Sequence, residues 1–151
     1  MTWWKKLVGS PDELESIDYY DEGAHLLDQR RFHEALTSFR LALKEAPGDP
    51  VVLQQIAIAY SRIGMSDEAA KTYRHVLQKA PDAVGAHYGL AFLLVRAGQG
   101  SDAIPHLEAF LENTPASGAT QPHVEHARDT LAELRAGAES GEADTRESSA
   151  G

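Results

Sequence analysis

Cysteine is absent from all 151 residues of the chain. Its absence excludes a disulfide framework, a zinc site built from thiolates and a catalytic cysteine. Aromatic residues are also few, at 7%, and no apolar run approaches the roughly 20 residues that a membrane-spanning helix needs. Stability must therefore come from an apolar core, and 42% of hydrophobic residues is enough for one in a chain of this length.

Positive charge is also scarce, with 14 lysines and arginines against 23 acidic residues and a formal net charge of −9 at pH 7. Residues 1–10 carry +2, residues 11–136 carry −8 and residues 137–151 carry −3. Between Asp12 and Asp28 the chain has seven acidic side chains and neither lysine nor arginine. Nucleic acids bind to clustered lysine and arginine, so we expect no nucleic-acid partner and interpret the acidic stretch as a solvated surface.

Catalytic motifs are lacking too, because the sequence contains no glycine-rich phosphate loop, no Walker lysine and no nucleophile elbow. His123 and His126 share a predicted helix face, but a catalytic zinc site needs a third ligand, and none is nearby in the sequence. We therefore expect no catalytic residue, no metal site and no cofactor. A small metal-dependent enzyme that uses these histidines is the weaker rival hypothesis.

A period of 34 residues runs through the chain instead. Pro47, Pro81 and Pro115 keep this interval, and small and large apolar residues precede each of them in the same register. The small positions are Ala35, Ala69 and Ala103 with a second series at Gly23, Ala57 and Ala91, and the large ones are Phe39, Tyr73 and Leu107. Small residues let two helices approach closely while large neighbours fill the space beside them, so the pattern predicts helical hairpins stacked on one another.

These features resemble the tetratricopeptide repeat, a family with this period. The resemblance covers about residues 16–117 and implies an all-α, right-handed solenoid of antiparallel helical hairpins, with repeats at about 16–49, 50–83 and 84–117. The family's preferred tryptophan is replaced by Tyr19, Leu53 and His87, of which the last is polar.

Local chemistry predicts the ends of the helices. A capping box at Ser10 predicts a first helix from Pro11 to about Asp28. Asp49 is expected to cap a helix that ends near Ile63 at Gly64, and two serines are predicted caps for the second helices of repeats two and three, Ser66 and Ser101.

Beyond Pro115 the period breaks, and residues 121–136 are predicted to form a helix that caps the last repeat. Its apolar stripe consists of Val124, Ala127, Leu131 and Leu134. Residues 137–151 are acidic and contain no large apolar side chain, so we expect a disordered tail there.

The resemblance implies that the first helix of each hairpin lines a concave groove that binds a peptide. Apolar residues there would anchor the peptide, glutamines would bond its backbone and arginines would pair with acidic side chains. A packing role is the competing interpretation for each of these positions, which are Tyr20, Asp21, Ala24, Leu27, Asp28, Gln54, Gln55, Ile58, Arg62, Tyr88, Gly89, Phe92 and Arg96.

Chaperone-binding members of the family hold a terminal carboxylate with a clamp of lysine, asparagine and arginine on these inner helices. By register, the clamp positions here are Tyr20, Ala24, Gln55, Gly85 and Gly89. None of these side chains can neutralise a carboxylate, so a ligand of the heat-shock-protein type is not expected.

Residues 1–10 form a separate amphipathic segment. In a short helix, four apolar side chains would lie opposite two lysines, with Trp3, Trp4, Leu7 and Val8 on one side and Lys5 and Lys6 on the other. This segment is predicted to contact a membrane or a partner, and docking onto the chain's own repeats is the alternative. The lysines interrupt any secretory signal core, so we expect a cytoplasmic protein, with the inner membrane surface as the alternative location.

Together these observations predict a non-catalytic protein–protein interaction module, an adaptor or assembly factor whose partner is a protein or peptide with apolar anchors. The main rival is a membrane-peripheral scaffold that is anchored by residues 1–10 and self-associates.

The anchor hypothesis predicts that the protein binds anionic vesicles and that binding weakens with added salt. Replacing Trp3 and Trp4 with alanine should weaken flotation with the vesicles and leave the helical circular dichroism signal unchanged. Failure of the wild-type protein to float at low salt would rule out the membrane interpretation.

Overall fold

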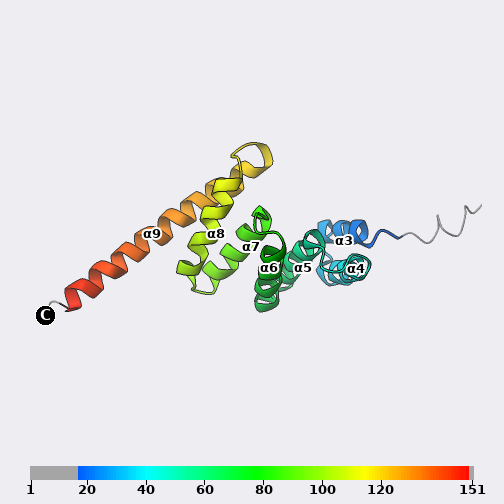
Figure 1. Cartoon of the computed structure of the whole chain (residues 1–151), viewed down its shortest axis with the longest axis horizontal. Helices are drawn as coiled ribbons and strands as arrows, with labels where there is room; N and C mark the ends of the chain where they lie inside the picture. Colours follow the sequence, from blue (N-terminus) through cyan, green and yellow to red (C-terminus); the bar gives the residue numbers. More distant parts are fainter. Residues whose placement is uncertain (1–16, 150–151) are drawn as a thin grey trace, which may run out of the picture.

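A computed structural model of the chain describes residues 17–149 and contains α-helices and one short 3-10 helix in this region. Figure 1 shows the helices stacked in a row, with the last helix leaving the stack at one end. The elements in chain order are α3 (Tyr19–Asp28), α4 (Phe32–Glu45), α5 (Pro50–Ile63), α6 (Ser66–Lys79), α7 (Val84–Arg96), α8 (Gly100–Asn113), η1 (Gly118–Thr120) and α9 (Gln121–Ser149).

The predicted all-α solenoid is confirmed. Helices α3 and α4, α5 and α6, and α7 and α8 pack as pairs, and each pair falls inside one 34-residue unit of the sequence. Successive pairs pack through α4 against α5 and α6 against α7. No helix in the described part of the chain combines the length and apolarity that crossing a bilayer requires.

The small and large residues of the repeat form the contacts between helices. Ala35, Ala69 and Ala103 are fully buried, and so are the large residues Phe39 and Leu107. In the first hairpin a methyl group added at Gly23 would lie only 2.7 Å from ring carbons of Phe39. The phenylalanine therefore occupies the volume that any side chain at position 23 would need.

The core forms two clusters that meet inside the second hairpin. One cluster joins the first hairpin to α5, and the other runs from α5 to α9. Leu43 and Tyr60 pack against both clusters, so the core is continuous along the stack. Continuity of this kind is expected of repeats that cannot bury their apolar faces alone.

Some predicted helix ends are confirmed. The Asp49 carboxylate accepts hydrogen bonds from the backbone N–H groups of Val51 and Val52, and Pro50 is the first residue of α5. Gly64 ends α5 with φ 94°, a left-handed conformation that glycine adopts without a steric penalty.

Other predicted helix ends are wrong. Ser66 and Ser101 lie within the first turns of α6 and α8, whose cap residues, Met65 and Gln99, form no side-chain cap hydrogen bond. The first repeat helix does not run unbroken to Asp28, because Asp18 is extended and its carboxylate caps α3 at Tyr20 and Asp21. An aspartate at this position accepts hydrogen bonds from the free N–H groups of the next turn. It therefore favours a helix that starts just after it over a helix that runs through it.

Arg30, between α3 and α4, has a φ of 62° and is the one non-glycine residue with a positive φ among residues 17–149. The equivalent positions one and two repeats later are Gly64 and Gly98, which also have positive φ. The left-handed conformation costs a non-glycine residue about 1–2 kcal/mol. The first repeat therefore carries a strained arginine where the other two carry glycine.

Helix α9 is longer than predicted. It continues to Ser149, so the predicted end at Ala136 is wrong, and residues 137–149, for which disorder was predicted, are helical. The predicted stripe does pack, because Val124, Ala127 and Leu131 are buried against the end of the stack, whereas every described side chain from Arg135 to Ser149 is exposed. Alanine and glutamate favour helix without needing burial, which explains why the absence of apolar residues did not end the helix.

His87, the polar residue at the family's tryptophan position, is accommodated by hydrogen bonds. Its Nε2 lies 2.7 Å from the carbonyl oxygen of Pro81, so Nε2 carries the hydrogen and donates it. In neutral His87 the Nδ1 is then the acceptor, and Nδ1 of His106 donates to it across 3.0 Å. Burial lowers the pKa of His106, and positive charge on His87 and Arg74 lowers it further, whereas Asp102 opposes the shift.

Truncation should separate the two halves of α9. Deleting residues 137–151 should leave the thermal midpoint nearly unchanged, because the described side chains in that segment bury nothing. Deleting residues 121–151 exposes the surface under Leu131 and Val124, and loss of each buried large apolar side chain costs about 1.5–3 kcal/mol. Thermal unfolding followed by circular dichroism measures both effects, and equal midpoints would contradict the capping role.

Acidification should weaken the third hairpin. The folded pKa of His106 lies below its unfolded value, so the unfolded chain binds more protons as the pH falls. The stabilising effect of neutral His106 is complete above about pH 6.5 and is lost as the pH falls through the lower, folded pKa. Thermal midpoints of the wild type should fall more on acidification than those of His106→Gln. Exposed His75 provides the control, and a His75→Gln variant should behave like the wild type.

Candidate functional site

An apolar pocket lies between α5 and α7 and has a volume of about 290 Å³. We call it the α5–α7 pocket. Side chains from α6, α8 and the start of α9 complete it, and its lining consists of Gln54, Ile58, Tyr73, Val84, Gly85, Tyr88, Gly89, Phe110, Thr114, Thr120 and His123.

Two glycines on α7 set the depth of this pocket. A methyl group at Gly89 would lie 2.5 Å from the hydroxyl oxygen of Tyr73, and one at Gly85 would lie 2.4 Å from Nε2 of Gln54. Any larger residue would push Tyr73 or Gln54 out of place. Glycine therefore lets side chains of the preceding hairpin reach the face of α7.

The aromatic wall of the pocket includes residues of α9. The Tyr88 ring packs 4.9 Å from the Phe110 ring and 5.2 Å from the His123 ring, and the Tyr88 hydroxyl lies 3.3 Å from Nδ1 of His123. Partial burial raises the pKa of the Tyr88 phenol. Tyr88 consequently remains a neutral hydroxyl at physiological pH and can serve in hydrogen bonding.

One buried polar atom of the pocket lining has no partner. The Oγ1 atom of Thr114, just after α8, is buried and makes no hydrogen bond to another described residue. An unbonded buried hydroxyl costs free energy, and rotation of the Thr114 side chain into the pocket would let a ligand's donor or acceptor group recover it. The Thr120 hydroxyl, by contrast, donates to the backbone carbonyl of Ser117 at 2.7 Å.

The structure divides the predicted groove residues into three groups. Gln54, Ile58, Tyr88 and Gly89 meet in the α5–α7 pocket. Tyr20, Ala24 and Leu27 are partly buried against the first core cluster, and the Tyr20 hydroxyl accepts a hydrogen bond of 3.4 Å from Gln55. The remaining predicted groove residues do not line the pocket. Phe92 packs between the rings of Tyr88 and His126, at 4.7 and 4.4 Å, Arg62 lies over the Phe32 ring, and Arg96, Asp21 and Asp28 are exposed.

Sequence reasoning missed the pocket residues that come from outside α5 and α7. The repeat pattern predicts packing for Tyr73 and makes no prediction for Phe110 or Thr114, and His123 is considered there only as a metal ligand. Its contact with Tyr88 depends on where α9 docks, which the repeat pattern does not specify. The residues predicted to contact a membrane or partner, Trp3 to Val8, lie outside the described residues.

Comparison with a sequence model of the tetratricopeptide-repeat family gives a match over residues 64–128. The match begins at the end of α5 and extends into the first turns of α9. No curated protein sequence matches the chain.

Solved structures with the same fold cover most of the chain. The type III secretion chaperone SycD of Yersinia enterocolitica, in complex with a peptide of the translocator YopD, is 15% identical, with a TM-score of 0.71 over 83% of this chain and 95% of that one. The TPR2B domain of yeast Sti1, in a pHsp70 complex, is 17% identical, with a TM-score of 0.67 over 76% and 94%. The Sgt2 TPR domain of Aspergillus fumigatus is 22% identical, with a TM-score of 0.66 over 85% of each chain.

The 34-residue period, the stacked helical hairpins, the family match and these shared folds agree with one another. Residues 64–128 therefore match the tetratricopeptide-repeat family, and the stack of hairpins has the fold of these solved structures.

Proposed function

We propose that this protein is a non-catalytic protein-interaction module that binds a peptide segment in the α5–α7 pocket and acts as an adaptor or assembly factor. The observation that carries the proposal is an apolar pocket that contains one unpartnered buried hydroxyl, at Thr114, on the face formed by the first helices of two hairpins. Small apolar pockets with a few placed polar groups are typical ligand sites.

The pocket favours an apolar side chain as the anchor of the peptide. Ile58, Val84 and Phe110 contribute apolar walls, and no lysine, arginine, aspartate or glutamate is among the lining residues. A terminal carboxylate would remain without a cationic partner there, whereas an apolar side chain would lose unfavourable contact with water. The anchor is therefore an internal apolar residue of the partner.

The polar groups of the pocket suit the backbone of the same peptide. The Thr114 hydroxyl and the Gln54 carboxamide can each donate and accept hydrogen bonds. Both residues line the pocket together with apolar side chains, so a peptide could insert a side chain and bond its adjacent amides at once. Such a combination is expected of an interaction hot spot.

Proteins of the same fold support this proposal by analogy. SycD is described in complex with a peptide of YopD, and the Sti1 domain is described in a complex with pHsp70. Both pairings are between a helical-repeat protein and a polypeptide ligand. The present chain shares their fold. The lining of its α5–α7 pocket contains no charged clamp and favours an apolar anchor.

A pair of variants should test the pocket. Ile58→Ala should weaken capture of the partner at least about tenfold, equivalent to about 1.4 kcal/mol, because it removes part of an apolar wall. Thr114→Val should weaken capture while leaving thermal stability unchanged or higher, since valine has a similar shape and removes the unbonded hydroxyl. Quantitative mass spectrometry of proteins captured by wild type and variants from the same extract measures both.

Val51→Ala serves as the matched control, because Val51 is on the same helix but is 58% exposed and lies outside the pocket. It should capture the same proteins as the wild type. Capture profiles of folded Ile58→Ala and Thr114→Val that equal the wild-type profile would show that the pocket is not the working surface.

A further inference from the structure

We infer that the turn between α3 and α4 is a second interaction surface, which binds an acidic segment of a partner protein. This basic turn comprises Arg30, Arg31, Phe32 and His33, together with Arg62 at the end of α5. Together with Glu34 and Ile63, these residues line a surface pocket of about 340 Å³ that shares no lining residue with the α5–α7 pocket. The inference does not depend on the proposed function of that pocket.

The other two repeats provide an internal comparison. Residues 64–67 read Gly, Met, Ser and Asp, and residues 98–101 read Gly, Gln, Gly and Ser at the equivalent turns. Neither turn has a basic side chain, although both connect helices of the same hairpin geometry. The hairpin therefore does not require the positive charge found in the first repeat.

Arg30 occupies its place at a conformational cost. Its φ of 62° lies in the left-handed region, where the equivalent Gly64 and Gly98 are unstrained. A strained residue in place of glycine is a reason to look for a function of its side chain. The side chain of Arg30 is exposed and lines the surface pocket of the basic turn.

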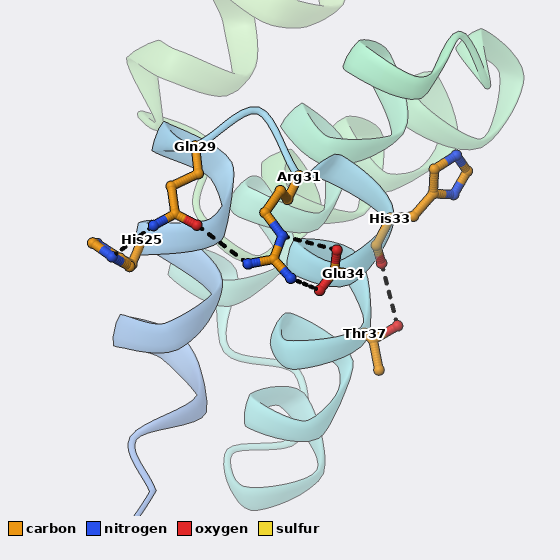
Figure 2. Close-up of polar contacts among 6 residues, drawn as sticks. All are labelled: His25, Gln29, Arg31, His33, Glu34 and Thr37. Atoms are coloured by element: carbon orange, nitrogen blue, oxygen red, sulfur yellow. Dashed lines mark hydrogen bonds and ion pairs between the residues drawn. The ribbon is translucent and has the colours of Figure 1, made fainter.

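Contacts inside the basic turn leave the guanidinium groups of Arg30 and Arg62 available to a ligand. Figure 2 shows Arg31 paired with both carboxylate oxygens of Glu34 and directed toward the Gln29 side chain, which also contacts His25. Arg62 is placed over the Phe32 ring, with its guanidinium carbon 4.9 Å from the ring centre. Within residues 17–149, neither Arg30 nor Arg62 has a carboxylate at ion-pair distance.

The start of α4 adds positive potential to the same place. Arg31 is the cap residue, and no side chain accepts a hydrogen bond from the first N–H groups of α4. Free N–H groups at a helix start favour negative charge nearby. The other second helices also lack side-chain caps, but only α4 combines this feature with arginines in the turn.

The negative charge of the rest of the chain favours a short acidic peptide over a long polyanion as the partner. The protein carries a net charge of −9, and Asp18, Asp21 and Glu22 lie at the start of the helix that leads into the basic turn. A long polyanion such as a nucleic acid would be repelled by this surface. A short acidic peptide segment can pair with Arg30 and Arg62 without approaching those carboxylates.

Fluorescence anisotropy of the full chain with a labelled oligoglutamate peptide tests the inference, with oligoglutamine of the same length as the comparison probe. The wild type should bind oligoglutamate in preference, and binding should weaken with salt. Arg62→Gln should lower the affinity about tenfold, as expected for loss of a hydrogen bond to a charged group. Arg30→Gly should lower it similarly while keeping or raising the thermal midpoint, because glycine removes the backbone strain.

Control variants separate this surface from general charge and from the α5–α7 pocket. Arg128→Gln, on the exposed side of α9, and Ile58→Ala should bind oligoglutamate like the wild type. Equal binding of both probes, unchanged affinity in folded Arg30→Gly and Arg62→Gln, or an equal loss in Arg128→Gln would overturn the inference. Tighter binding of a single-stranded oligonucleotide than of oligoglutamate would also overturn it.

Discussion

Close approach of helices at residues with little or no side chain is the constraint on which the rest of this structure depends. Gly23 meets the Phe39 ring, and fully buried alanines occupy the equivalent places in later repeats. Interiors pack at crystal-like density, so a small residue on one helix requires a large one opposite. Repetition of that pair every 34 residues makes each hairpin the template for the next.

The same constraint creates the candidate binding pocket. Gly85 and Gly89 continue the use of small residues onto the exposed face of α7, where Gln54 and Tyr73 of the preceding hairpin fill the space. Helix α9 then ends the stack and adds His123 and Thr120 to the pocket wall. One element thus covers the last apolar surface of the stack and shapes the proposed site.

Two departures from the repeat pattern introduce polar side chains. Arg30 replaces a glycine at a left-handed position, and His87 replaces a large apolar residue with a pair of hydrogen bonds to Pro81 and His106. Neighbouring groups accommodate His87 through these hydrogen bonds, whereas Arg30 keeps a local conformational cost. A repeat fold allows this, since each hairpin contacts only its neighbours and a local change does not propagate through a shared centre.

The 34-residue period was sufficient to predict the three hairpins and the buried small and large positions, and local capping chemistry predicted the Asp49 cap and the end at Gly64. These features depend on residues close in sequence or one period apart, and on backbone preferences that a single residue expresses. Tertiary structure decided which predicted groove residues meet. Gln54, Ile58, Tyr88 and Gly89 share a pocket, whereas Phe92 is covered by His126, and Thr114 and Phe110 enter from another helix. The length of α9 and the left-handed Arg30 also became clear only in the structure. The docking of a non-repeated helix depends on the summed packing of distant surfaces, which no local pattern of residues encodes.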